Sequence, residues 1–204
     1  MIRKILALPL VIIALLTAST GLQHTASAQI SVAPPWTTLF DGSTLDGWKK
    51  LGDANWTIVK SADGDYVEAT SGPGFLMTPR AYTNFHMRLE FWTDPPANSG
   101  IFIRCSKTDA VGADNAYEVN IFDQRPDPKY RTGGIVNVAE PKVKVDAAGR
   151  WNTYEITADG PTFTVKMNGV LTAEGSDAKF ASGPIALQYG AGTVRFRNVQ
   201  IQTF

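Results

Sequence analysis

A two-residue alternation of apolar and polar side chains, repeated in short segments, restricts the fold of this chain more than any other feature. In residues 86–92, for example, Met87, Leu89 and Phe91 fall on one face of an extended chain. The same period occurs in residues 101–105, 117–122 and 163–167. Because successive residues of a β-strand point to opposite faces, this period predicts strands that are buried on one side.

Turn dipeptides separate these segments. Asn168-Gly169 lies between residues 163–167 and 170–173 and predicts a β-hairpin, because both residue types adopt the positive φ angles of a tight turn. No segment after residue 28 keeps a helical period over several turns. Many short strands with turn signals between them are typical of an antiparallel sandwich or barrel. We predict an all-β sandwich of two antiparallel sheets, with less than about a tenth of the mature chain in helices.

The composition of the 204 residues fits one domain and excludes two classes of protein. Hydrophobic residues make up 44% and charged residues 19%, which excludes an intrinsically disordered chain. The 19 basic residues balance 19 acidic ones, so the chain lacks the basic surface that binding to nucleic acid requires. The single cysteine, Cys105, excludes an internal disulfide and a cysteine-ligated zinc site. Since Cys105 alternates with Ile101 and Ile103, we expect it to be buried on their face and unreactive.

The first 28 residues have the pattern of a secretory signal peptide. Arg3 and Lys4 precede an apolar run, residues 5–16, and Ala26 and Ala28 form a small-residue cleavage site. A membrane anchor is the alternative, but the run is shorter than the ~20 residues that a spanning helix needs. We therefore expect cleavage after Ala28, a periplasmic or secreted protein, and no membrane anchor in the mature chain.

The polar faces of three predicted strands carry large aromatic and charged side chains rather than the Thr, Ser and Lys of a solvated face. These residues are His86, Arg88, Glu90 and Trp92, then Phe102 and Arg104, and finally Glu118, Asn120 and Phe122. Aromatic faces contact the C–H groups of sugars, whereas Arg, Asn and carboxylates bind their hydroxyls. The pattern predicts a concave floor for a carbohydrate. In the alternative, Arg104 and Glu118 form a cross-strand ion pair without function, and the pattern alone leaves both open.

Several segments, in a fixed order along the chain, carry specific residues that the alternation of apolar and polar side chains does not require. They are residues 36–48, 82–91, 98–104, 117–123, 151–153, 165–170, 183–188 and 194–199, and the first opens with Trp36-Thr37-Thr38-Leu39-Phe40-Asp41-Gly42. In these segments and their spacing the chain resembles the 3-keto-disaccharide hydrolase domain family, which implies a concanavalin A-like jelly-roll sandwich. The resemblance covers residues 36–204, and residues 29–35 form a short N-terminal segment ahead of it.

The resemblance implies hydrolysis, or elimination followed by hydration, of glycosides already oxidised to a ketone at carbon 3. Such a ketone acidifies the proton on carbon 2, so a carboxylate can remove it, and the enolate oxygen then needs a cation or a hydrogen-bond donor. The leaving oxygen departs with help from an acid. We assign Glu118 as general base, Arg104 as the group that stabilises the enolate, and Asp123 as acid or substrate-orienting group. Asp123 follows a strand, so turn capping is an equal alternative.

Five further residues are predicted to bind the substrate: Asn98, Asn120 and Gln188 through sugar hydroxyls, and His86 and Trp92 through contacts with the ring. Asn98 can instead be a turn residue, Gln188 can satisfy buried backbone, and His86 can be solvated. The family usually carries Gln at the position of Asn120 and often carries a His shortly after Gln188, where this chain has Tyr-Gly. We expect no cofactor; a divalent metal would fit the family, but no ligand motif supports one.

Two classes of function remain open, both with a carbohydrate as partner. The first is an exported enzyme that cleaves 3-keto-glycosides, and the second is a carbohydrate-binding module with the same fold. A cell-envelope interaction domain is a third. A binding module needs aromatics and amides, whereas catalysis also needs a carboxylate and a cation that converge. Glu118 and Arg104 on neighbouring polar faces favour the enzyme.

Overall fold

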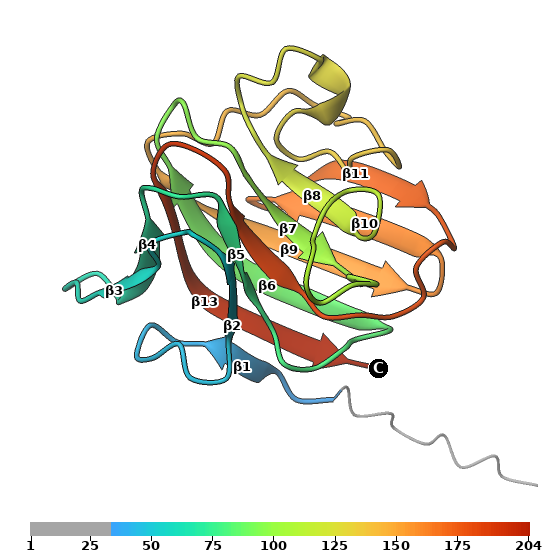
Figure 1. Ribbon diagram of the computed structural model, residues 1–204. Coiled ribbons are helices and arrows are strands. Elements are labelled where there is room, and N and C mark those ends of the chain that lie inside the picture. Colours follow the sequence, from blue (N-terminus) through green and yellow to red (C-terminus); the bar gives the residue numbers. More distant parts are fainter. Residues whose placement is uncertain (1–33) are drawn as a thin grey trace, which may run out of the picture. The chain divides into compact units, whose positions relative to one another are not determined.

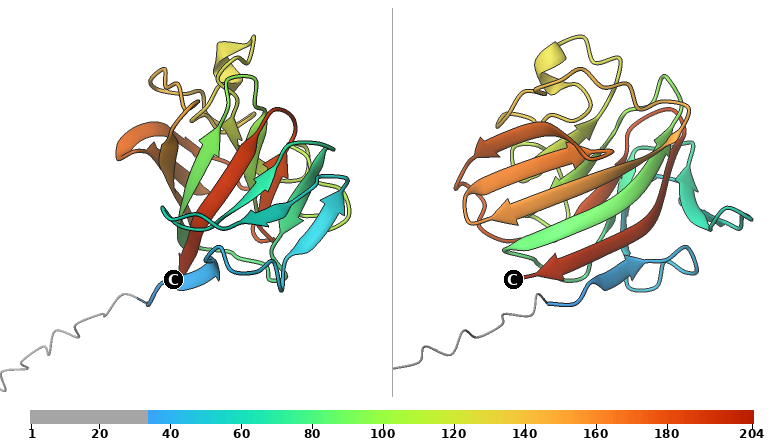
Figure 2. Two further views of the ribbon diagram at one scale, coloured as in Figure 1. Left: turned by 90° about the vertical axis from the view of Figure 1, so that its left-hand side faces the viewer. Right: turned by 180° about the vertical axis from the view of Figure 1, so that it is seen from behind.

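The computed structural model describes residues 34–204, which form two antiparallel β-sheets packed face to face (Figure 1, Figure 2). The predicted signal peptide, residues 1–28, lies outside the described residues. The strands are β1 (Thr37–Phe40), β2 (Lys49–Gly52), β3 (Thr57–Val59), β4 (Tyr66–Ala69), β5 (Gly74–Met77), β6 (Phe85–Thr93), β7 (Ser99–Ile103), β8 (Tyr117–Ile121), β9 (Trp151–Asp159), β10 (Thr162–Met167), β11 (Val170–Ser176), β12 (Ala186–Tyr189) and β13 (Val194–Thr203). Within residues 34–204 the only helical element is the short 3-10 helix η1 (Pro128–Tyr130). The prediction of an all-β sandwich is confirmed.

The two sheets differ in size and draw their strands from distant parts of the chain. The larger sheet has eight strands in the order β11-β10-β9-β6-β13-β4-β3, and β1 also pairs with β13. The smaller sheet has five strands in the order β2-β5-β12-β7-β8. Long connections between antiparallel neighbours such as β6 and β13 are typical of a jelly roll. A site on either sheet is therefore assembled from residues that are far apart in sequence.

The core lies between the inner faces of the two sheets. Four residues of β6 are at most 1% exposed: Phe85, Met87, Leu89 and Phe91. They alternate with half-buried or exposed residues, as the sequence predicts. Tyr154 of β9 is buried with them, and its hydroxyl donates to the carbonyl of Asn120 in β8 at 2.8 Å, which ties the two sheets together. Because burial of an apolar side chain of this size contributes about 1.5–3 kcal/mol, the inner faces provide most of the stability.

The alternation predicted for β7 breaks at its last residues. Arg104 follows Ile103 and has a φ of 52°, a left-handed conformation that costs about 1–2 kcal/mol for a residue with a side chain. The Arg104 side chain turns into the interior, and Cys105 turns to the outer face of the smaller sheet, beside Phe102 and Met77. The sequence prediction assigned these two residues to the opposite faces and is wrong in that respect. The predicted burial of Cys105 is confirmed, because only 2% of the residue is exposed.

The predicted hairpin joins β10 and β11. Asn168 and Gly169 at its tip have φ values of 52° and 80°, the two positive angles of a type I′ turn. The Oδ1 atom of Asn168 accepts a hydrogen bond from the backbone N–H of Thr153 at 2.9 Å. This bond holds the turn against β9, the next strand of the larger sheet.

A long connection between β8 and β9 covers the edge of the smaller sheet. Its residues 133–136 run beside β8: the N–H of Val136 donates to the carbonyl of Glu118 at 2.9 Å, and the N–H of Asn120 donates to the carbonyl of Gly134 at 3.0 Å. Further along, the N–H of Lys142 donates to the carbonyl of Thr172 in β11 at 2.7 Å. The connection therefore pairs with one sheet and reaches the other, and it flanks the strand that carries Glu118 (Figure 1).

Candidate functional site

The outer face of the smaller sheet brings distant polar residues together. Gln188 of β12 lies beside Gly100 of β7, because the neighbouring pair, Leu187 and Ile101, is in register. On the other side of β7, Gly100 lies opposite Asn120 and Phe102 lies opposite Glu118. The intervening residues of these strands belong to the core, so the polar side chains project away from it. We call this surface, which comprises Gly100, Phe102, Glu118, Asn120 and Gln188, the Glu118 face.

Gly100 leaves the space in which two of these side chains meet. A Cβ atom at Gly100 would lie 3.0 Å from Oε1 of Glu118 and 3.4 Å from Oε1 of Gln188. A contact of 3.0 Å is tighter than most Cβ atoms make, so a side chain here would require the Glu118 carboxylate to shift by a few tenths of an ångström. A glycine within a strand often marks such a close approach. The strand thus gives up side-chain packing at Gly100 and allows the carboxylate to lie over the sheet.

The electrostatic environment of Glu118 suits a general base. Burial raises the pKa of Glu118 from 4.5 to about 7, and the positive charge of Arg125 opposes that rise. The side chain is only half-buried, and it makes no hydrogen bond within residues 34–204. A carboxylate whose pKa lies near neutral pH can both accept and return a proton at that pH, as general acid–base catalysis requires.

Two amide oxygens beside Glu118 lack hydrogen-bond donors. Asn120 is 1% exposed; its Nδ2 atom donates to the carbonyl of Tyr130, whereas its Oδ1 atom is buried and has no partner within residues 34–204. The Oε1 atom of Gln188 is likewise buried and unpartnered within that range. A buried acceptor left without a donor costs about 1–3 kcal/mol. Both oxygens therefore keep an acceptor capacity that no donor within residues 34–204 uses.

Arg125 is the cation of this site, and the sequence interpretation did not include it. Its guanidinium carbon lies 5.8 Å from the ring centre of Phe122 and 5.7 Å from that of Tyr130. Tyr130 is also the residue whose carbonyl binds Asn120, so one short segment supports both the cation and the amide. Arg125 belongs to the turn that follows β8, outside the alternating segments from which the candidate residues were chosen. The available signal was its position beside Phe122, just after the strand of Glu118.

Arg104 does not reach the Glu118 face, which corrects the role predicted for it. Its Nε atom donates to the carbonyl of Thr83 at 2.9 Å, and Nη1 donates to the carbonyl of Gly160 at 2.7 Å. The guanidinium carbon lies 5.2 Å from the ring centre of Phe163 in the core. Only 1% of Arg104 is exposed. The residue clamps loops at one end of the sandwich, and neither an enolate nor an ion pair with Glu118 is within its reach.

Asp123 has a structural role close to the turn-capping alternative that the sequence left open. Both of its carboxylate oxygens accept hydrogen bonds from the connection between β8 and β9. Its Oδ1 atom accepts from the hydroxyl of Thr132 at 2.5 Å. Its Oδ2 atom accepts from the backbone N–H groups of Ala147 and Ala148 at 2.7 and 3.0 Å. Both carboxylate oxygens thus hold the long connection between β8 and β9 closed. An acid whose oxygens are occupied in this way is poorly placed to protonate a leaving group.

Asn98 lies at the rim of the Glu118 face. It precedes β7 by one residue and forms an isolated bridge with Ala191, just after β12. Its side chain packs on Gly190, where an added Cβ atom would lie 3.0 Å from Nδ2. Asn98 is half-buried and follows the same alternation as Gly100, so it adds an amide group at the end of the site nearest Gln188.

His86 and Trp92 lie on the other side of the molecule, which corrects the prediction of a single floor. Both belong to β6 in the larger sheet, where they pair with Gln202 and Arg195 of β13. His86 contacts the hydroxyl of Thr157 through Nδ1 at 2.9 Å. The predicted floor is therefore divided between the outer faces of two sheets, and the core separates these residues from Glu118.

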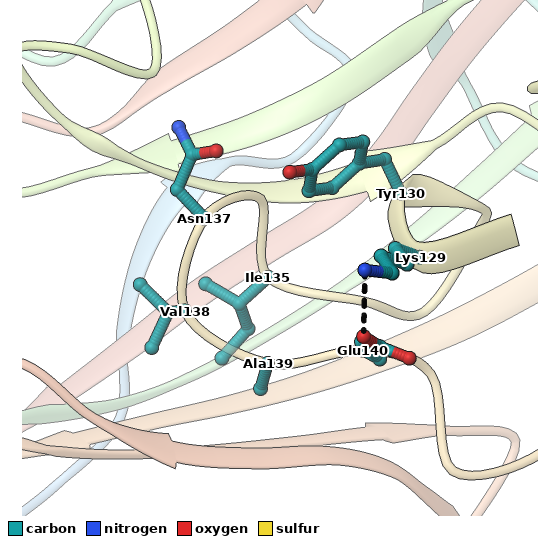
Figure 3. A pocket seen from close by; sticks show the side chains of 7 residues that line it. All are labelled: Lys129, Tyr130, Ile135, Asn137, Val138, Ala139 and Glu140. Atoms are coloured by element: carbon teal, nitrogen blue, oxygen red, sulfur yellow. Dashed lines mark ion pairs between the residues drawn. The ribbon is translucent and has the colours of Figure 1, made fainter. Parts of the chain in front are cut away.

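A small hollow of about 220 Å³ opens within the long connection (Figure 3). Tyr130 and Asn137 line one part of it, and the ion pair between Lys129 and Glu140, 3.8 Å apart, lines another. Asn137 is exposed and has a φ of 63°, a conformation that Asn tolerates better than most residues. Tyr130 also contacts Arg125 with its ring and Asn120 with its carbonyl. The hollow therefore adjoins the segment that holds these two residues at the Glu118 face.

Two further observations concern residues 34–204. No three His, Cys, Asp or Glu side chains in this range lie close enough together to hold a metal ion. No helix in the same range is long and apolar enough to span a membrane.

Comparisons with known proteins agree with this architecture. The family described as the 3-keto-alpha-glucoside-1,2-lyase-like domain matches residues 35–202. The chain belongs to this family. A curated member of the same group, 3-keto-disaccharide hydrolase from Bacteroides thetaiotaomicron, is 28% identical over 159 aligned residues, and the match covers 64% of this chain and 55% of the relative. The chain thus spans about half the length of that relative. The resemblance predicted from the sequence is confirmed.

Solved structures share the fold. Two candidate glycosyl hydrolases from Parabacteroides distasonis superpose with TM-scores of 0.66 and 0.71, at 24% and 17% identity. Each covers 83% of this chain, and the matched part is 100% of the first structure and 94% of the second. The carbohydrate-binding module CBM66 from Bacillus subtilis superposes with a TM-score of 0.58 at 20% identity, covering 77% of this chain and 96% of the module. These likenesses support the sandwich fold of this chain.

Proposed function

We propose that this protein cleaves glycosides that carry a ketone at carbon 3, with Glu118 as the general base. The single observation that carries the proposal is the position of Glu118. Its carboxylate has a pKa raised to about 7 and lies beside the unpartnered oxygens of Asn120 and Gln188. The family and the name of the Bacteroides relative support the 3-keto substrate class.

The proposed reaction begins with the transfer of the carbon 2 proton to the Glu118 carboxylate. The electron pair of that C–H bond forms the carbon 2–carbon 3 double bond of an enolate, and the negative charge moves to the carbon 3 oxygen. Collapse of the enolate expels the oxygen on carbon 1 with its electron pair, and a proton completes the leaving hydroxyl. Water then adds to carbon 1, and carbon 2 regains a proton. Each step leaves the oxidation level of the sugar unchanged, so no redox partner is required.

Arg125 takes the role that the sequence assigned to Arg104. A cation near the carbon 3 oxygen stabilises the enolate, and such preorganised electrostatic stabilisation is usually the largest catalytic contribution. Because Asp123 is engaged with Thr132 and two backbone N–H groups, Glu118 itself is the better donor for the leaving oxygen. One carboxyl group that first accepts and then returns the proton suffices for this sequence of steps.

The proposal includes export. Residues 1–28 have the charged, apolar and small-residue pattern of a secretory signal. The mature chain would then act in the periplasm or outside the cell, where glycosides from the surroundings are accessible. Fractionation of the source cells, followed by N-terminal sequencing, tests this point: a mature protein starting at Gln29 supports export, and an uncleaved cytoplasmic chain contradicts it.

Turnover of defined substrates tests the enzymatic function. The mature protein is incubated with a panel of 3-keto-disaccharides and with the same disaccharides unoxidised, and released monosaccharides are quantified by mass spectrometry. We expect cleavage of 3-keto-disaccharides only, and loss of cleavage in Glu118→Gln with binding retained. Binding of the panel without cleavage by the wild-type protein would instead identify a carbohydrate-binding module.

A further inference from the structure

The outer face of the larger sheet lies on the opposite side of the core from the Glu118 face (Figure 2, right). A second hollow lies on this outer face. It has a volume of about 410 Å³ and adjoins a hollow of about 300 Å³, with Arg88 and Thr153 lining both. The two together form a groove across β9, β6 and β13. We call it the Trp36 groove; its principal residues are Trp36, His86, Arg88, Thr153, Glu155 and Thr157. Small-molecule sites have volumes of about 300–1,000 Å³.

Aromatic surface is accessible at one end of the groove. Trp36 is 38% exposed, and the guanidinium carbon of Arg88 lies 4.4 Å from its ring centre. Nearby, the ring of His86 packs against Phe204 at 4.7 Å between centres, and Phe204 is 50% exposed. Exposed aromatic rings supply the apolar platform on which the C–H faces of a sugar pack.

Polar groups along the groove keep unused hydrogen-bonding capacity. The Nε atom of Arg88 donates to Oε1 of Gln200 at 2.6 Å, which fixes the side chain and leaves its two Nη groups without a partner in residues 34–204. Within the same range, the Glu155 carboxylate and the Thr153 hydroxyl form no hydrogen bond and no ion pair. The groove therefore offers donors, acceptors and a hydroxyl at fixed positions on two adjacent strands.

Two arginines elsewhere on this sheet face are engaged with carboxylates and aromatic rings. Arg195 pairs with Glu68 at 2.7 Å, and Arg197 pairs with Glu90 at 2.7 Å. The guanidinium carbons of these two arginines lie 4.2 Å from the ring centre of Trp92 and 4.1 Å from that of Trp151, respectively. The arginines thus cover the aromatic faces and occupy the carboxylates. Arg88 contacts Trp36 in the same way, but Trp36 remains 38% exposed at the groove.

We propose that the Trp36 groove is a second, non-catalytic saccharide site that binds a neutral oligosaccharide chain. Among the charged side chains that line the groove within residues 34–204, Arg88 and Glu155 form no ion pair and carry opposite charges, so the lining itself favours neither an anionic nor a cationic ligand. A polyhydroxyl chain uses both charges as hydrogen-bond partners and covers the ring of Trp36. Since the sandwich core separates the groove from Glu118, this site holds a chain without contributing to its cleavage.

Tryptophan side-chain NMR of the mature protein tests the proposal directly. The chain contains five tryptophans, and the indole N–H signal of Trp36 is assigned from Trp36→Phe. Maltotetraose and cellotetraose serve as probes of unoxidised α- and β-linked chains, each added up to about 10 mM, well above a Kd of ~1 mM. We expect at least one probe to shift the Trp36 signal in the wild-type protein and equally in Glu118→Gln.

Variants separate this site from the Glu118 face. Trp36→Ala and Glu155→Gln should each weaken binding of the probe, Trp36→Ala by about tenfold or more, while turnover of 3-keto-disaccharides stays at the wild-type level. Thr162→Ala, an exposed change on β10 opposite Asp159 and outside the groove lining, should leave binding unchanged. The proposal is overturned if neither probe shifts the Trp36 signal, or if binding survives Trp36→Ala and is lost in Gln188→Ala. A protein that binds at the groove but cleaves nothing would contradict only the proposed enzymatic function.

Discussion

Replacing Glu118 by glutamine should stabilise the fold at alkaline pH, because the folded state holds this carboxylate at a cost. Burial raises the pKa of Glu118 from 4.5 to about 7, and each pKa unit corresponds to about 1.4 kcal/mol. Full ionisation thus costs the folded state about 3.5 kcal/mol at most. Because the side chain keeps some contact with water, we expect about 1–3 kcal/mol. Glutamine has the same shape and carries no charge to desolvate.

The direction of the pH dependence follows from proton binding. Between pH 4.5 and about 7 the folded state binds the Glu118 proton while the unfolded state has released it. The contribution of this group to the free energy of unfolding therefore falls as pH rises through this window and is level above it.

Urea unfolding of the wild type and Glu118→Gln, at about pH 4 and about pH 8.5, measures the difference. The variant should match the wild type at the lower pH and exceed it at the higher. Glu155→Gln, an exposed position, is the matched control, with changes within about 0.5 kcal/mol. Equal stability of Glu118→Gln and wild type at the higher pH would refute the buried-carboxylate argument.

Three further predictions follow from single residues. Arg125→Met removes the positive charge that lowers the pKa of Glu118, so the acidic limb of the kcat/KM profile should move to higher pH by up to about 1 unit; an unmoved limb means that Arg125 does not act on Glu118. Arg104→Met removes the hydrogen bonds of the buried guanidinium to the carbonyls of Thr83 and Gly160 and should lower the free energy of unfolding by about 2–4 kcal/mol, because hydrogen bonds from a charged donor contribute most. Turnover by the folded fraction should be kept, whereas lost turnover with full stability would return Arg104 to the mechanism. Burial raises the pKa of the Cys105 thiol from 9.0 to about 12, so a thiol reagent at neutral pH should label the native protein at least about 10²-fold more slowly than the urea-unfolded chain; rapid native labelling would contradict the burial.

The alternation of side chains predicted the strands and the division into core and outer faces because that period is a local property. Met87, Leu89 and Phe91 are buried as the pattern requires. The pattern does not determine which strands share a sheet. β6 pairs with β9 and β13, whereas β7 pairs with β8 and β12, and these are long-range choices. For this reason His86 and Trp92 were grouped with Glu118, although the core separates them.

The sequence misplaced one arginine, Arg104, and missed another, Arg125, for different physical reasons. Arg104 was assigned to the outer face because the alternation assumes an extended backbone throughout, and a single positive φ of 52° reverses the faces beyond it. Non-glycine residues rarely adopt this conformation, so the sequence carries no strong signal for it. Arg125 lies in a turn, and its relation to Glu118 depends on how the turn folds back onto β8. Glu118 and Gln188 could be predicted because both lie within regular strands.

The rate at which the carbon 2 proton leaves a 3-keto-glycoside tests the central claim most directly. The signal of that proton is followed by NMR in D₂O with the wild-type protein and with Glu118→Gln, at ligand concentrations that saturate both. If Glu118 is the base, the wild type accelerates loss of the signal and Glu118→Gln is about 10²–10⁴-fold slower, although it still binds. Products that retain the carbon 2 proton, or exchange by Glu118→Gln at the wild-type rate, would contradict the account.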